Sequence, residues 1–303
     1  MNVVAEQKFH IPVMLNEILD HLNLAPGKTI VDATIGTAGH SIEIIKRILP
    51  GGKLIGIDRD AESLEVARDR LSDYSQDCEF VHGNFCDLDD ILTKLRVTQI
   101  DGVLFDLGVS SFQLDNPQRG FSFQQEGPLD MRLDRSSFIS AYDLINNLTQ
   151  DEISSLLWSF GEERWHNRIA RFLVKERENH PISSTSQLSS IVMQAIPPRY
   201  RYRHFRIHPA TRTFQAVRIA VNRELETLQL AINKVFPFLR EGARVCVISF
   251  HSLEDRIVKL SFRKAAHEKT VHLITVKPAR PMHQEIIDNP SSRSAKLRIA
   301  EKI

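Results

Sequence analysis

Strand-like and helix-like patterns of apolar residues alternate along the first third of the chain. Short β-branched or apolar runs that end at a polar residue predict buried strands, and apolar residues three or four positions apart predict amphipathic helices. The strands are expected at 29–32, 53–58, 79–82 and 100–106, and the helices between them at 42–49, 61–71 and 87–95. This rhythm predicts an α/β fold, built on a parallel sheet with right-handed crossover connections.

The alternation stops after residue 106 and resumes toward the C-terminus. Residues 107–137 have no apolar period and predict a long loop, which we expect to be ordered because disordered segments are poor in aromatic residues. Helices are then expected at 149–161, which starts with a Thr149–Glu152 capping box, and at 165–178, 185–196 and 211–236. A strand at 243–250, a helix opened by Ser252 and closing strands at 272–276 and 296–300 follow. The pattern predicts a discontinuous sheet domain, 1–115 and 209–303, with a helical insertion at 116–208.

The most informative motif is the turn after the first strand, Asp32-Ala33-Thr34-Ile35-Gly36-Thr37-Ala38-Gly39. Glycine allows positive φ and lets a ligand approach without meeting a Cβ. Asp58 ends the second strand, where a carboxylate can accept both ribose hydroxyls of a nucleoside. The turn is neither a dinucleotide fingerprint nor a phosphate loop and has no basic residue, so it favours a cofactor without phosphates, such as S-adenosylmethionine. The alternative is a turn whose glycines serve packing only.

Four polar or aromatic positions lie where the predicted strands end. Ligands on such sheets bind beyond the carboxyl ends of the strands, where Gly36, Asp58, Phe85 and Asp106 are expected to converge. Asp106 could orient a donor N–H of a substrate, and Gln113 in the following loop could hold the cofactor or a base edge. The alternative for Asp106 is that it caps the loop by accepting backbone N–H groups.

Composition limits the classes of protein that fit. The 303 residues are 42% hydrophobic and 25% charged, with a net charge of +1, so any nucleic-acid binding requires a local patch. Cys78, Cys86 and Cys246 lack metal-ligand spacing and fit a reducing compartment. The absence of an apolar signal core or a membrane-length apolar run leads us to expect a cytoplasmic protein without membrane contact.

A basic and aromatic segment at 196–223 contains no carboxylate. Arginine forks bind phosphates and aromatic faces stack on bases, so the segment favours a nucleic-acid surface over an ordinary solvated basic face. Its candidate contacts are Arg199, Arg201, Tyr202, Arg203, Arg206, His208 and Arg212. His204 and His208 share helical spacing, but Pro209 follows and no acid lies nearby, so we expect no metal site.

Two candidates lie nearer the C-terminus. His251 sits at the end of the 243–250 strand and could either face the pocket or belong to a helix start in which Ser252 is the N-cap. Arg293 lies in a second basic segment, 289–298, and could contact nucleic acid. The residues alone do not separate these roles.

Several of these segments together resemble one known family. They are His10-Ile11-Pro12-Val13-Met14, the turn at 32–41, 56–60, 106–111, 119–123, 129–132, 208–216, 249–256 and 292–296, in this order. The chain resembles the MraW family of bacterial ribosomal RNA small-subunit methyltransferases over nearly its full length. Ala38 is a departure, because many members carry glycine there; its methyl group fits if φ is negative.

The resemblance implies a class I, Rossmann-like methyltransferase sheet with an inserted helical domain that helps to recognise RNA. It implies methyl transfer from S-adenosylmethionine to the exocyclic N4 of one cytidine in the decoding region of 16S ribosomal RNA, with the small ribosomal subunit as partner. Cofactor contacts carried over from the family fall on Ala38, Gly39, His40, Asp58, Phe85, Asp106 and Gln113. We expect Asp106 to orient the amine. A homodimer, a noncatalytic nucleotide-binding scaffold for ribosome assembly and a DNA amino-methyltransferase stay open.

Overall fold

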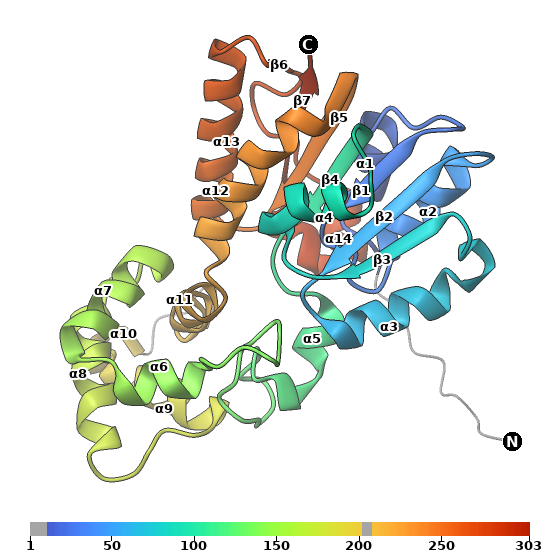
Figure 1. Cartoon of the computed structure of the whole chain (residues 1–303). Coiled ribbons are helices and arrows are strands. Elements are labelled where there is room, and N and C mark those ends of the chain that lie inside the picture. The colour runs from blue at the N-terminus through green and yellow to red at the C-terminus, as the bar shows by residue number, and fades with distance from the viewer. Residues whose placement is uncertain (1–10, 202–207) are drawn as a thin grey trace, which may run out of the picture. The chain divides into compact units, whose positions relative to one another are not determined.

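The chain forms two compact units (Figure 1). The structure, a computed structural model, describes residues 11–201 and 208–303. The first unit comprises Met1–Gly108 and Leu225–Ile303, and the second comprises Val109–Glu224. The chain thus leaves the first unit once and returns to it once.

A seven-stranded sheet forms the centre of the first unit, in the order β3-β2-β1-β4-β5-β7-β6. Its strands are β1 (Thr29–Asp32), β2 (Lys53–Asp58), β3 (Cys78–His82), β4 (Ile100–Asp106), β5 (Leu239–Ser249), β6 (Val271–Leu273) and β7 (Lys296–Lys302). The first five strands pair in parallel, as the sequence predicts. β7 pairs antiparallel with both β5 and β6, so the sheet is mixed rather than wholly parallel.

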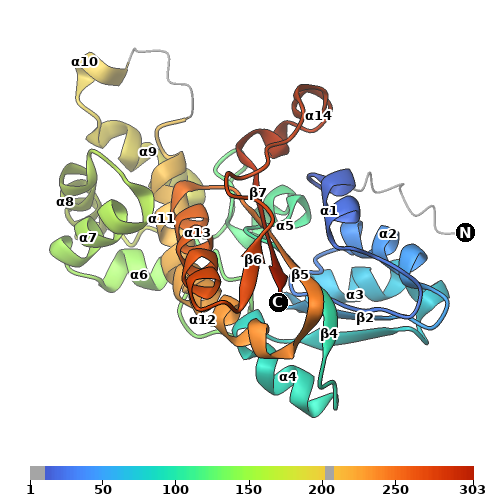
Figure 2. The same cartoon turned by 90° about the horizontal axis from the view of Figure 1, so that it is seen from above.

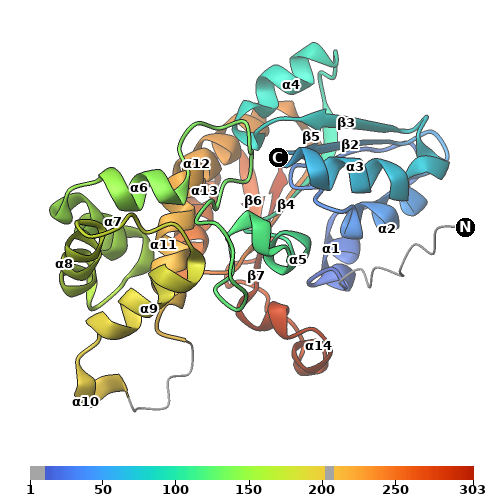
Figure 3. The same cartoon turned by 90° about the horizontal axis from the view of Figure 1, so that it is seen from below.

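Helices cover both faces of this sheet. They are α1 (Leu15–His21), α2 (Gly39–Ile48), α3 (Ala61–Arg70), α4 (Leu88–Lys94), α12 (Glu224–Val235) and α13 (Ser252–His267). The short helix α14 (His283–Asp288) belongs to the same unit and has no buried residues. Buried residues of α4, α12 and α13 form one apolar cluster with the sheet, and buried residues of α1, α2 and α3 form another. Figures 2 and 3 show α4 and α12 on one side of the strands and α1 on the other.

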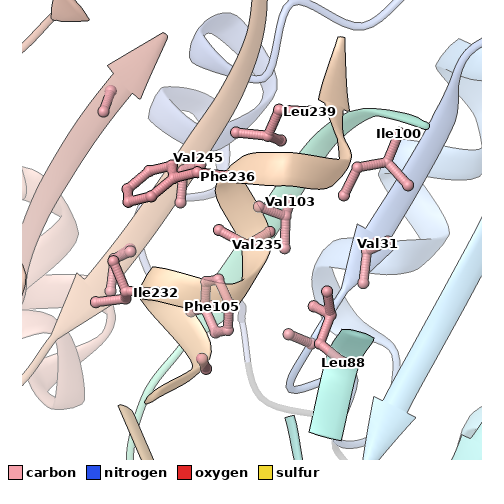
Figure 4. Close-up of a cluster of buried hydrophobic side chains, with 14 of the residues drawn as sticks. Val31, Leu88, Ile100, Val103, Phe105, Ile232, Val235, Phe236, Leu239 and Val245 are labelled. Carbon is pink, nitrogen blue, oxygen red and sulfur yellow. The ribbon is translucent and has the colours of Figure 1, made fainter. Parts of the chain in front are cut away.

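The first of these clusters shows why the sheet is stable. Val103 and Phe105 of β4 are fully buried against Ile232 and Val235 of α12 (Figure 4). Their neighbours in β1 and β5 are also apolar on this face. Strands covered on both sides need such continuous apolar runs, and each fully buried side chain of this size contributes about 1.5–3 kcal/mol. The runs at 100–106 and 243–250 therefore dictate the centre of the sheet.

The second unit is helical in its described part. Its helices are α5 (Ser111–Asp115), α6 (Ala141–Asn147), α7 (Gln150–Gly161), α8 (His166–Arg177), α9 (Thr185–Ala195), α10 (Pro198–Arg201) and α11 (Thr211–Asn222). The predicted capping box of α7 is confirmed, because Thr149 Oγ1 accepts from Glu152 N and Glu152 Oε2 accepts from Thr149 N. Within the described ranges of both units, no helix has the length and apolar character needed to cross a bilayer.

The continuous helix predicted for 211–236 is wrong. α11 ends at Asn222, Arg223 adopts a left-handed conformation with φ of 51°, and α12 starts at Glu224. The apolar period continues through the break because each helix buries one face, α11 in the second unit and α12 against the sheet. No glycine or proline marks the change of direction.

The segment 107–137 contains more regular structure than a loop. α5 begins at Ser111, and a 3-10 turn covers Pro117–Arg119. Arg119 is almost fully buried and donates from Nη2 to the carbonyl oxygens of Arg132 and Leu133, at 3.1 and 2.9 Å. An internal cation thus organises this segment, which explains its order without an apolar period.

The second unit is larger than the expected insertion at 116–208. Val109 at one end and Val221 at the other pack against the unit's apolar cluster, and α11 packs against α7. These contacts assign the whole of Val109–Glu224 to the compact helical unit. The boundaries at 116 and 208 are predicted from changes in composition, whereas the bounds of the compact unit are determined by which residues pack together.

Candidate active site

The carboxyl group of Asp32 organises the turn after β1. Its Oδ2 accepts from Ser41 Oγ at 2.7 Å, and its Oδ1 accepts from the Thr34 backbone N–H at 3.2 Å. Burial raises the pKa of Asp32 to about 6, although the Ser41 and Thr34 hydrogen bonds oppose the shift. Asp32 therefore links the end of β1 to the first turn of α2.

Asp58 at the end of β2 holds the same turn from the other side. Its Oδ2 accepts from Gly36 N at 2.8 Å and its Oδ1 accepts from Asp60 N at 2.9 Å. Gly36 has a φ of 51°, which glycine adopts without strain. Burial raises the pKa of Asp58 to about 6. The backbone N–H of Arg59 also bonds to this carboxyl group. An ionised carboxylate offers about four acceptor sites, so about one remains for a hydroxyl of a ribose.

The turn ends at Ala38 and Gly39, and each has a distinct constraint. A Cβ added to Gly39 would lie 2.9 Å from Cγ of Pro12, so the Pro12 ring requires glycine there. Ala38 has a φ of 63°, so the condition of a negative φ is not met. A left-handed alanine costs about 1–2 kcal/mol. The hydrogen bond from Ala38 N to Ile35 O, at 2.8 Å, stabilises the turn and offsets part of this cost.

His40 joins this turn to the N-terminal segment and to β4. The ring is 6% exposed, its Nε2 lies 2.9 Å from the carbonyl oxygen of Val13, and its Nδ1 lies 3.6 Å from Asp106 Oδ2. Burial lowers the pKa of His40 to about 4. His40 is therefore neutral at pH 7. Its Nε2 faces the carbonyl of Val13 and its Nδ1 faces the carboxyl group of Asp106.

Asp106 at the end of β4 has the most unusual environment of the described acids. Its backbone N–H donates to Thr34 Oγ1 at 2.7 Å, which ties β4 to the turn. Its Oδ1 is buried and has no hydrogen-bond partner within the described part of the chain. Burial, followed by the charges of Asp32 and Glu254, raises the pKa of Asp106 to about 8. A partnerless buried oxygen of this kind is poised to accept from a ligand N–H.

Phe85 follows β3 and packs against Phe105 of β4. Its ring meets the ring of Phe105 edge to face, with centroids 5.8 Å apart and planes at 89°. Asn84 Oδ1 accepts from Cys86 N and starts the 3-10 turn Phe85–Asp87. Phe85 is thus held as a fixed apolar wall where β3 ends. Gly36, Asp58, Phe85 and Asp106 all follow parallel strands of one sheet, as the sequence predicts.

Comparison with known proteins decides the family. The MraW methylase family matches residues 7–303. Proteins named ribosomal RNA small subunit methyltransferase H are similar: that of Halothermothrix orenii is 46% identical over 97% of this chain and 98% of its own, and that of Clostridioides difficile is 47% identical over 97% and 99%. The chain belongs to the MraW methylase family. It is therefore a methyltransferase that uses S-adenosylmethionine, with the Rossmann-like sheet that the sequence predicts.

One solved structure also resembles the chain. A candidate rRNA methylase of Clostridium thermocellum matches 95% of this chain and 95% of its own, with 14% identity and a TM-score of 0.47.

Gln113 lies in the second unit of this MraW family member. It completes the capping box of α5, because its Oε1 accepts from Ser110 N at 3.0 Å and its own N–H donates to Ser110 Oγ at 3.3 Å. The side chain is buried. Its contact with the cofactor stays a prediction.

His251 has a structural role in the methylase as the N-cap of α13. The sequence pattern assigns this role to the next residue, Ser252. His251, not Ser252, is the N-cap of α13, and its Nδ1 accepts from Glu254 N at 3.3 Å. Glu254 Oε2 accepts from the backbone N–H of His251 and Phe250 in return. His251 Nε2 lies 3.1 Å from Glu254 Oε1, outside hydrogen-bond geometry. A contact with RNA stays a prediction.

For five of the basic and aromatic candidates of the methylase, the structure describes no side chain. Tyr202, Arg203 and Arg206 lie outside the described residues, as do the side chains of Arg199 and Arg201. The other three are described. His208 stacks on Phe123 with centroids 4.6 Å apart, Arg212 is exposed and donates from Nη1 to the carbonyl of Glu162, and Arg293 is exposed in a 3-10 turn.

The structure adds an aromatic and basic cluster in the second unit that the sequence reasoning missed. The exposed Arg164 lies over the rings of Trp165 and Tyr200, 5.0 and 5.6 Å from their centroids, and these rings lie 5.3 Å apart. We call Arg164, Trp165 and Tyr200 the aromatic cluster. The sequence pattern assigns Trp165 to the start of the helix at 165–178 and places Tyr200 in the basic and aromatic segment at 196–223, so it does not bring the three residues together.

Proposed function

We propose that this MraW methylase transfers a methyl group from S-adenosylmethionine to the exocyclic N4 of a specific cytidine in the decoding region of 16S ribosomal RNA, within the small ribosomal subunit. Its cytoplasmic location follows from that substrate. The observation that carries the proposal is Asp106, whose buried and partnerless Oδ1 lies where β4 ends, beside the cofactor turn. The relatives named ribosomal RNA small subunit methyltransferase H support the choice of RNA.

The turn after β1 fits the cofactor in shape and in charge. Gly36 and Gly39 present backbone without side chains, and the tight approach of Pro12 to Gly39 keeps the loop thin. The remaining acceptor capacity of Asp58 suits a ribose hydroxyl, and Phe85 offers an apolar wall where β3 ends. S-adenosylmethionine supplies an electrophilic methyl group on a positively charged sulfur. The acids Asp32 and Asp58, whose pKa values of about 6 leave them ionised at pH 7, give this edge of the sheet the opposite charge.

Asp106 can make the cytidine amine reactive. The lone pair of N4 is delocalised into the ring, so the amine is a weak nucleophile until a hydrogen-bond acceptor draws on one of its N–H groups. Asp106 Oδ1 is such an acceptor, and burial keeps water from competing for it. The base must also leave its stack, which costs a few kcal/mol in a duplex and less in an irregular site. Orientation then provides much of the rate.

The second unit offers surfaces that suit single-stranded RNA. The aromatic cluster combines two rings with an exposed guanidinium. His208, which follows Tyr200 closely in the sequence, lies against the ring of Phe123. Unpaired bases stack on aromatic and arginine planes, and guanidinium groups bind phosphates. These observations favour the RNA-recognition role for the helical unit. The homodimer stays a prediction.

Methyl transfer to purified small subunits tests the proposal. Subunits from a strain that lacks this protein are incubated with the enzyme and S-adenosylmethionine labelled in its methyl group, and the RNA is digested to nucleosides. We expect label in N4-methylcytidine. Subunit binding without any label would favour the noncatalytic scaffold, and label in DNA instead of RNA would favour the DNA amino-methyltransferase.

A further inference from the structure

His40 is held in one orientation by a segment far away in the sequence. Its Nε2 lies 2.9 Å from the carbonyl oxygen of Val13. Residues 11–14, which we call the strap, are in turn fixed by the C-terminal region: Met14 N donates to Glu285 Oε1 at 2.6 Å, and Asn289 Nδ2 donates to the carbonyl of Ile11 at 2.9 Å. The position of the Val13 carbonyl is therefore determined on both sides.

This geometry selects one tautomer of the ring. A carbonyl oxygen only accepts hydrogen bonds, so the Nε2 of His40 must carry the hydrogen. The Nδ1 of the neutral ring is then a lone pair, and it lies 3.6 Å from Asp106 Oδ2. Two acceptors facing each other inside a protein repel unless a proton lies between them. The pair is thus suited to hold one proton on Asp106 Oδ2, which reaches His40 Nδ1 once the two groups approach by a few tenths of an ångström to hydrogen-bond distance.

Methylation of an amine requires a proton acceptor. When N4 forms its bond to the methyl carbon and the carbon–sulfur bond breaks, the positive charge moves from sulfur to N4. The charged N4 still carries both of its hydrogens, and one must leave as a proton to give the neutral product. Asp106 Oδ1 accepts a hydrogen bond from this amine under the proposed function, so it is the nearest group for that proton.

We propose that Asp106 and His40 form a two-step proton path for this reaction, an inference that rests on the proposed function. Asp106 Oδ1 takes the proton from the methylated N4, and Asp106 passes its Oδ2 proton to His40 Nδ1. One proton leaves N4 and one arrives on the ring, so Asp106 stays neutral and His40 becomes an imidazolium. His40 is a catalytic base by this account, and Glu285 and Asn289 are positioning residues that act through the strap.

The protonation states of the pair agree with this path. Asp32 and Glu254 are the charged groups that act on Asp106, and together with burial they keep it protonated at pH 7. Burial keeps His40 neutral and free to accept. The charged amine of the product is a far stronger acid than an imidazolium, so the proton moves downhill. Once pH rises above the pKa of Asp106, its carboxylate can take the proton directly and His40 is no longer needed.

Two variants of His40 separate catalysis from positioning. His40→Gln keeps an N–H that can reach Val13 O but removes the basic Nδ1. His40→Asn removes both the base and the reach to Val13. General acid–base groups contribute about 10²–10⁴-fold to rates. We expect single-turnover methyl transfer by His40→Gln to be at least about tenfold slower than wild type at pH 6.5 and within about threefold at pH 9. The rates are compared at saturating cofactor, because His40 is also an expected cofactor contact; cofactor affinity, measured by calorimetry, should weaken less in His40→Gln than in His40→Asn.

A rate deficit in His40→Gln that is the same at both pH values would overturn the path, because a purely structural defect has no reason to vanish as Asp106 ionises. Long-range ¹H–¹⁵N spectra of the protein without substrate give a readout that does not depend on activity: they should show a neutral His40 with its hydrogen on Nε2. A hydrogen on Nδ1 would contradict the inference. If wild type methylates no cytidine, the proposed function itself fails, whereas a pH-independent deficit in an active enzyme rejects the proton path alone.

Discussion

The two oxygens of the Asp106 carboxyl group have different surroundings. Oδ1 is buried without a partner, and Oδ2 faces His40 Nδ1. The side chain is 26% exposed, yet its pKa is raised to about 8. A carboxyl that is harder to ionise in the folded state than in the unfolded chain lowers the stability of the protein as pH rises. The site therefore contains a group that favours the reaction and opposes folding.

Asp106→Asn should be more stable than wild type at high pH. The folded pKa lies above the unfolded value, so the destabilisation is absent below about pH 4, grows as pH rises and is complete above about pH 8. At about 1.4 kcal/mol per pKa unit and with partial exposure to solvent, we expect a gain of about 1–3 kcal/mol at pH 8.5. Urea unfolding at pH 5 and pH 8.5 measures it. An equal change at both values would show that ionisation of Asp106 is not the cause.

Helix starts account for much of what could be predicted at the scale of the element. Thr149 and Glu152 specify the start of α7 because both partners of the capping box are encoded three residues apart. The same rule applied to α13 selected Ser252, since serine is a common N-cap, whereas His251 fills that position with a ring nitrogen. The break at Arg223 carried no signal at all, because only packing in two separate cores requires it.

The His251 cap makes a measurable contribution to the start of α13. Loss of an N-cap side chain costs about 1 kcal/mol, so His251→Ala should lower the free energy of unfolding by about this amount. His251→Asn, which can still accept from Glu254 N, should retain most of the stability. Chemical denaturation of both variants provides the measurement. Unchanged stability in His251→Ala, together with weaker RNA binding, would instead identify His251 as a substrate contact.

At the scale of the whole molecule, the residues proposed for chemistry and those proposed for RNA recognition lie in different units. The turn after β1, Asp58 and Asp106 belong to the unit built on the sheet, and the aromatic cluster belongs to the helical unit. The fold of the sheet and the residues at its strand ends could be predicted because alternating patterns and short polar motifs encode them. The reversal of β7, the buried Arg119 and the aromatic cluster could not, because each depends on contacts between distant segments.

This separation predicts that RNA binding can be weakened without loss of cofactor binding. Arg164→Ala removes the guanidinium over Trp165 and Tyr200 and should weaken binding of a single-stranded RNA from the decoding region by about 1 kcal/mol or more. Lys53→Ala removes one exposed positive charge at the amino end of β2 and is the matched control. Fluorescence anisotropy and calorimetry with the cofactor give the two affinities. Equal RNA binding by both variants would remove the aromatic cluster from the recognition surface.

The hold of the C-terminal region on the strap sets the order in which a growing chain can complete its site. Met14 bonds to a residue 271 positions later, and Ile11 to one 278 positions later. During synthesis the glycine turn leaves the ribosome well before Glu285 and Asn289, which follow Met14 and Ile11 by 271 and 278 positions. Until then nothing in these contacts fixes the carbonyl of Val13 or the ring of His40. In a nascent methylase the ring of His40 thus lacks this support until the segment that contains Glu285 and Asn289 has been translated.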